Sequence, residues 1–85
     1  MSMVQQLIAA VASAERQLDD QTMKLRSYLA EIDRVSARVE NALRGSEQQY
    51  AQNMLQQLVL TKREVEETIN RLQAAKEKLA RVRMI

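Results

Sequence analysis

The stretch Leu43-Arg44-Gly45-Ser46-Glu47-Gln48-Gln49-Tyr50 decides the fold, because it interrupts a helical pattern that otherwise runs through the whole chain. Gly45 is the only glycine, and there is no proline. A glycine directly after a helix can adopt the left-handed conformation that ends it. Ser46 can then cap a second helix, and Gln49, three residues later, completes a capping-box pattern. We therefore predict a helix at about 3–44, a turn at 45–46 and a helix at about 47–83.

Apolar side chains recur on both sides of this stretch at alternating spacings of three and four residues, as they do in coiled coils. When Val4 is taken as position a of a seven-residue repeat, every a and d position of the first half except Gln21 is apolar or aromatic. A second repeat starts at Ala51, and its a and d positions carry no charge. We call the predicted contact between these positions the seam. It comprises Val4, Leu7, Val11, Ala14, Leu18, Gln21, Leu25, Tyr28, Ile32, Val35, Val39 and Ala42 in the first half, and Ala51, Met54, Leu58, Thr61, Val65, Thr68, Leu72, Ala75, Leu79 and Val82 in the second.

A short turn makes two helices antiparallel, so residues whose numbers add up to about 93 should lie opposite each other. Val35 would then meet Leu58, and Leu18 would meet Ala75. The residues from Val4 to Leu7 would extend past the end of the second helix. The sequence thus predicts an all-α fold, a coiled-coil-like antiparallel two-helix hairpin that forms a single domain over residues 1–85.

Further apolar residues lie outside the predicted seam. Those at e positions, directly beside it, are Ile8, Leu29, Leu43, Leu55 and Ile69. Either the two helices make a broader contact with each other, or a second hairpin docks on this stripe and completes a four-helix bundle. We favour the second interpretation, with either another copy of the chain or a different helical protein as the partner. The predicted partner-binding residues are Met3, Val4, Leu7, Ile8, Leu29, Leu43, Leu55, Val59 and Ile69.

The composition argues against catalysis. The chain has no cysteine and no histidine, which removes thiol chemistry, the commonest general base and the usual transition-metal ligands. The acidic residues Glu64, Glu66 and Glu67 point to different sides of a helix, so they do not form a metal site. We predict a protein that is not an enzyme, with no catalytic residue, metal site or cofactor.

No apolar run is long enough to span a membrane, and no basic segment precedes the apolar N-terminus as it does in a signal peptide. We therefore expect no transmembrane segment and a cytoplasmic location, with export by a route that needs no signal peptide as the alternative.

Basic residues gather near the C-terminus, at Lys76, Lys78, Arg81 and Arg83. Cations in the last turns of a helix complement its dipole, and this structural role is the one we favour. In an alternative function, a dimeric helical-hairpin regulator would use them to bind RNA phosphates. The formal net charge of +2 and the scarcity of aromatic residues disfavour nucleic acid as a partner. A structural coiled-coil scaffold is a further alternative.

The opening stretch, at Leu43, Gly45 and Tyr50, resembles the turn of the WXG-type small helical hairpins of bacterial type VII secretion. In that family a W-x-G tripeptide closes the first helix, an aromatic residue follows early in the second, and the hairpins pair into four-helix bundles. Here Leu43 stands in place of the tryptophan, Gly45 matches the glycine and Tyr50 approximates the aromatic residue.

The chain departs from the family in lacking the tryptophan and the C-terminal Y-x-x-x-D/E export signal, since its tail Ala80-Arg81-Val82-Arg83-Met84-Ile85 contains neither Tyr nor an acid. The resemblance covers the chain in architecture and only the quoted stretch in motif. It implies a divergent, Trp-less member: a small effector, or an accessory protein or chaperone that binds the helical domain of a larger secreted protein.

Overall fold

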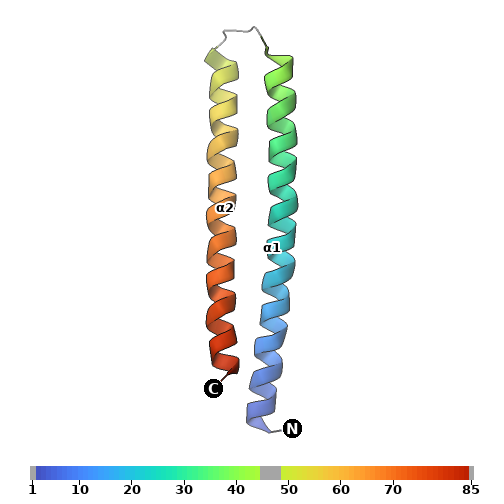
Figure 1. Ribbon diagram of the computed structural model, residues 1–85, viewed down its shortest axis with the longest axis vertical. Coiled ribbons are helices and arrows are strands. Elements are labelled where there is room, and N and C mark those ends of the chain that lie inside the picture. The colour runs from blue at the N-terminus through green and yellow to red at the C-terminus, as the bar shows by residue number, and fades with distance from the viewer. Residues whose placement is uncertain (1, 45–48, 85) are drawn as a thin grey trace.

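The computed structural model describes residues 2–44 and 49–84, which form two long helices lying side by side and running in opposite directions (Figure 1). Helix α1 spans Met3–Ala42 and helix α2 spans Gln49–Arg83. The molecule measures 66 × 15 × 14 Å. The predicted all-α antiparallel hairpin is confirmed. The predicted turn at Gly45 and Ser46 lies outside the described residues. Helix α1 ends at Ala42 rather than at 44, and the predicted start of the second helix at about 47 lies outside the described residues.

The start of α1 is fixed by a capping box. The hydroxyl of Ser2 accepts a hydrogen bond from the backbone N–H of Gln5 at 3.1 Å, and the Gln5 side chain accepts one from the Ser2 N–H at 3.2 Å. These bonds satisfy two donors that a helix start otherwise leaves free. At the other end of α1, the backbone N–H of Leu43 donates to the carbonyl of Val39 at 3.0 Å.

Two ion pairs between the helices show the register. Lys62 lies 2.8 Å from Asp33, and Lys76 lies 2.7 Å from Asp19. In both pairs the residue numbers add up to about 95, against the predicted value of about 93 for a short antiparallel connection. The register predicted from the sequence is therefore correct to within half a helical turn. The first residues of α1 project past the end of α2, as expected (Figure 1).

The stripe that α1 turns toward α2 differs from the predicted one. Its buried residues occupy a and e positions: Val11, Glu15, Thr22 and Ile32. The d residues that should have shared the seam are exposed instead, with Tyr28 at 51% and Val35 at 40% of their surface in solvent, and with Gln21 and Ala42 exposed as well. Helix α1 is thus rotated about its axis relative to the prediction, and its a and d seam is wrong in this respect.

The polar groups at the e positions and at the d positions of α1 give a physical reason for this rotation. The buried Thr22 hydroxyl donates to the carbonyl of Leu18 at 2.8 Å, so it needs nothing from α2. The Gln21 amide and the Tyr28 hydroxyl would face apolar residues of α2, and a buried polar group without a partner costs about 1–3 kcal/mol. Turning the e stripe inward leaves both of these groups in water.

On α2, too, a residue at an e position lies in the contact between the helices, where the prediction had placed it beside the seam. Ile69, which we expected beside the seam, is only 8% exposed and forms the contact between the helices together with Ala51. Leu29, Leu43 and Leu55 are half-buried. The burial of Ile69 supports the broader contact between the two helices at this position, so its expected place beside the seam is wrong. Of the α2 d residues, Thr68 and Val82 are exposed.

We predict that Ile69→Ala lowers the free energy of unfolding by about 2–4 kcal/mol, because it removes apolar atoms from the most buried part of α2. Met23→Ala is the matched control, since Met23 is exposed and also lies in mid-helix; it should change stability by less than about 0.5 kcal/mol. Denaturant titration followed by circular dichroism, at one fixed protein concentration, measures both. Equal losses in the two variants would contradict the assignment of Ile69 to the contact.

Candidate interaction surfaces

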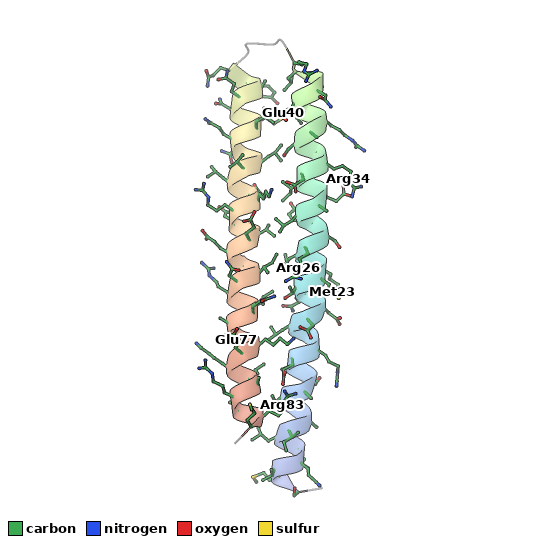
Figure 2. All side chains as sticks on the ribbon, viewed as in Figure 1. Met23, Arg26, Arg34, Glu40, Glu77 and Arg83 are labelled. Carbon is green, nitrogen blue, oxygen red and sulfur yellow. The ribbon has the colours of Figure 1, made fainter. Side chains whose placement is uncertain are left out.

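The hairpin has two long faces, and one of them is closed by ion pairs. Along this face three carboxylates of α1 meet three cations of α2: Glu15 with Arg83 at 3.4 Å, Asp19 with Lys76 at 2.7 Å, and Asp33 with Lys62 at 2.8 Å. Figure 2 shows Arg83 near the end of α2, on the side toward α1. We call this the ion-paired face. These three pairs match charges within the chain.

Glu15 is the most enclosed charged residue of the described segments, with 9% of its surface exposed. Its Oε1 atom is buried and forms no hydrogen bond, so the Arg83 guanidinium holds it by charge alone. A buried carboxylate depends strongly on such a partner, because removing the cation would leave an uncompensated charge. The pair therefore ties the last turn of α2 to α1.

Lys62 has a raised pKa. The hydrogen bond to Asp33 is the largest cause of the raised pKa, followed by the charge of Asp33; desolvation opposes them, and Glu66 makes the smallest contribution. Both partners are well exposed. The ion pair consequently orients α2 on α1 more than it stabilises the hairpin.

The opposite face carries shallow apolar hollows and is here called the open face. One hollow is lined by Gln21, Lys24, Leu25, Thr68 and Leu72. The next, toward the free ends of the helices, is lined by Ala14, Gln17, Leu18, Gln21, Ala75, Lys78, Leu79 and Val82. Gln21 lines both, so the hollows are continuous. Tyr28 and Val35 follow at the same seven-residue spacing along α1, and both are exposed.

The first turns of α1 form a second apolar surface, here called the N-terminal overhang and defined as residues 3–8. Met3 is 85% exposed and Leu7 is 55% exposed. No residue from 1 to 14 carries a charged side chain. The base of the overhang forms a hollow with the end of α2 that is lined by Val4, Leu7, Ile8, Val11, Val82 and Arg83.

The structure thus brings together four of the predicted partner-binding residues, Met3, Val4, Leu7 and Ile8, at one end of the hairpin. Leu55 and Val59 lie together in another shallow hollow, with Gln56 and Leu60, on α2. Leu29 and Ile69 are engaged in the helix contact, and Leu43 is half-buried at the end of α1. Of the residues that carry the family resemblance, Tyr50 is 71% exposed and Leu43 caps α1.

The sequence did not predict that Tyr28, Val35 and Val82 belong to an exposed face, because their d positions assigned them to the seam. The residue types at two d positions did indicate that this side of α1 is exposed. Tyr28 and its neighbour in the stripe, Gln21, both carry polar groups that an apolar two-helix contact cannot satisfy. The α2 threonines bond to carbonyls of their own helix: Thr61 donates to the Gln57 carbonyl and Thr68 to the Glu64 carbonyl, both at 2.9 Å.

The basic residues near the C-terminus do not form one free cluster. Lys76 and Arg83 are paired with carboxylates of α1, and Lys78 lines a hollow of the open face. Two of the four predicted phosphate contacts are therefore engaged within the chain. This arrangement weakens the RNA-binding alternative.

Comparison with known proteins adds no relative. No family model matches the chain, no curated protein matches it, and no solved structure matches it. Within residues 2–44 and 49–84, neither helix has an apolar segment long enough to cross a membrane. The same residues contain no group of three or more acidic side chains placed to hold a metal ion.

We predict that the Lys62–Asp33 pair makes stability depend on pH in the alkaline range. Since the pKa of Lys62 is raised above its ordinary value of 10.5, the contribution of the pair is complete below that pH and is lost as the pH rises through the higher pKa of the folded state. In a Lys62→Arg variant the pair stays charged throughout. Unfolding experiments between about pH 9 and 12 should show the natural chain losing more stability than the variant. Parallel curves would contradict the assigned cause.

Proposed function

We propose that this chain is a non-enzymatic protein–protein interaction module whose open face and N-terminal overhang are covered by helices of a partner, giving a four-helix core. One observation carries the proposal: the accessible surface is 6907 Å². A compact protein of the same mass, 9.8 kDa, would expose roughly 5200 Å². The excess is partly due to the rod shape, and it includes apolar side chains that a partner can remove from water.

The absence of a deep core supports the same proposal. No side chain of the described residues is fully enclosed, and the buried set contains only Val11, Ile32, Ala51 and Ile69 among apolar residues. Isolated helices gain most of their stability from packing an apolar face. Domains of this size usually require a further source of stability, such as assembly. Binding a partner would therefore stabilise the hairpin and also fulfil its function.

In its most concrete form, the module is a small effector of a type VII secretion system, or an accessory protein or chaperone of such an effector, which binds the helical domain of a larger exported protein. The two-helix architecture and the residues Leu43, Gly45 and Tyr50 support this form. The uncharged overhang supports it too, because an apolar helix end fits against another helix and not against a polar substrate.

We predict that the double variant Leu7→Glu, Ile8→Glu abolishes partner binding and leaves the hairpin folded, because both residues lie beyond most of α2. A loss of affinity of about 100-fold or more is expected when two apolar contacts are replaced by charges. The control is Gln6→Glu, which adds a charge to the same turn without removing an apolar residue. The measurement is copurification and titration with helical proteins encoded beside this chain's gene, together with circular dichroism of each variant.

Two results would count against this proposal. If no helical protein encoded nearby binds the natural chain, the secretion-accessory form is wrong. If a partner binds the double variant as well as it binds the natural chain, the overhang is not part of the binding surface.

A further inference from the structure

The sequence of the N-terminal overhang occurs a second time in the chain. Met3-Val4-Gln5-Gln6-Leu7-Ile8 opens α1, and Met54-Leu55-Gln56-Gln57-Leu58-Val59 lies in the first turns of α2. The two copies share four of their six residues and differ only by one aliphatic residue for another at the second and sixth positions. Both are helical, and neither contains a charged residue. The chain therefore carries the same short surface at two places.

The two copies differ in what covers them. In the first copy Met3 is 85% exposed and Leu7 is 55% exposed, because α1 extends here past the end of α2 (Figure 1). In the second copy the equivalent residues, Met54 and Leu58, are half-buried. Residue type and helical conformation are the same in both copies, so the difference in exposure comes from α1, which lies against the second copy. The apolar side of this sequence is thus a side that a helix covers.

The segment of α1 that covers the second copy has a simple pattern. The numbers of facing residues add up to about 95, which places the second copy beside residues 36–41. Between residues 36 and 43, the side chains withdrawn from solvent are those of Ser36, Val39 and Leu43. They follow the spacing of one helix stripe, and none is charged. The covering helix is antiparallel and offers a small residue and then, three and seven residues later, two aliphatic ones.

We propose that the N-terminal overhang binds a helix of another protein that carries this same pattern and lies antiparallel to α1, here called the docking helix. This inference names the chemistry of the partner for the interaction function proposed above and rests on it. The docking helix belongs to a different protein, because the stripe of Ser36, Val39 and Leu43 in each copy of this chain is covered by its own α2.

The space beside the overhang fits such a helix. An antiparallel helix on α1 has the direction of α2, so the docking helix continues the line of α2 beyond its C-terminus (Figure 1). If it faces the overhang as α1 faces the second copy, its small residue is level with Ile8 and its aliphatic residues lie beside the first turns of α1. The pattern spans eight residues, or about 12 Å. The first turn of the docking helix enters the hollow lined by Val4, Leu7, Ile8, Val11, Val82 and Arg83.

The size and charge of the overhang limit the pattern further. The last turn of α2 borders the hollow, so the docking helix has least room at its start, and the small residue of the pattern lies there. Between Met3 and Ile8 no side chain can pair with a charge. A buried charge without a partner is costly. The stripe of the docking helix is therefore uncharged, as it is on α1.

Exchanging two neighbouring residues in each copy tests whether only the second copy is covered within the chain. Gln57→Leu with Leu58→Gln keeps the composition and moves the leucine off the covered side. It should lower the urea midpoint of unfolding by about 1 M or more. The same exchange in the first copy, Gln6→Leu with Leu7→Gln, is the matched variant and should leave the midpoint within about 0.5 M. Equal shifts in the two variants would overturn the comparison on which the docking helix rests.

Binding is tested with the covering segment itself as the probe. A peptide with the sequence of residues 33–44 is held helical by a hydrocarbon link between positions 37 and 41, which are exposed in α1. At about 1 mM, a concentration that half-saturates a site with a dissociation constant of that size, it should shift the amide NMR signals of residues 3–11 in the natural chain. It should not shift them in the Gln6→Leu, Leu7→Gln variant. The control peptide carries Val39→Gln with Leu43→Gln and should shift none of these signals.

Shifts confined to other residues, equal shifts with both peptides, or no shift at all would overturn the docking helix. Concentration-dependent shifts of residues 3–8 in the natural chain alone would make a second copy the occupant and would overturn it too. The proposed function is judged separately. If a helical protein encoded beside the gene binds the natural chain and not the Leu7→Glu, Ile8→Glu variant, only the pattern inferred here fails. If no such protein binds, the proposed function fails as well.

Discussion

Two helices lying side by side can each bury only one stripe of side chains, so the architecture depends on which stripe α1 turns inward. The a positions face α2 under either choice. The remaining choice lies between the d stripe, with Gln21 and Tyr28, and the e stripe, with Glu15 and Thr22. On the e stripe the Thr22 hydroxyl bonds to the Leu18 carbonyl, and the charge of Glu15 is opposed by Arg83 at 3.4 Å without a hydrogen bond to its buried Oε1. The d stripe offers no such partners within a two-helix contact.

This choice separates the two faces of the hairpin. Rotating α1 toward its e stripe moves Asp19 and Asp33 close to Lys76 and Lys62, and the ion-paired face results. It simultaneously exposes Tyr28 and Val35 on the other side. Each surface pair is worth well under about 1 kcal/mol. Together they favour this rotation.

Much of the fold could be predicted from the sequence, because helix composition, a single glycine and a sustained repeat all indicate the same hairpin. The approximate register followed from the short connection. The rotation of α1 did not follow from the repeat alone, since d and e flank a on opposite sides of the helix. Thr22 has its partner, the Leu18 carbonyl, within α1, but the partner of Glu15 is Arg83, which is known only once both helices are placed. Met3, Leu7 and Ile8 are exposed, and their role in binding a partner stays a prediction, whereas Ile69 is buried where α2 is turned toward α1.

The two exposed surfaces differ in what they can recognise. The N-terminal overhang is apolar and uncharged, so it can bind a complementary groove but can reject a wrong partner only by shape. The open face combines an apolar groove with charges of fixed sign and spacing, and it can reject a partner by repulsion. The open face is for this reason the more selective of the two surfaces.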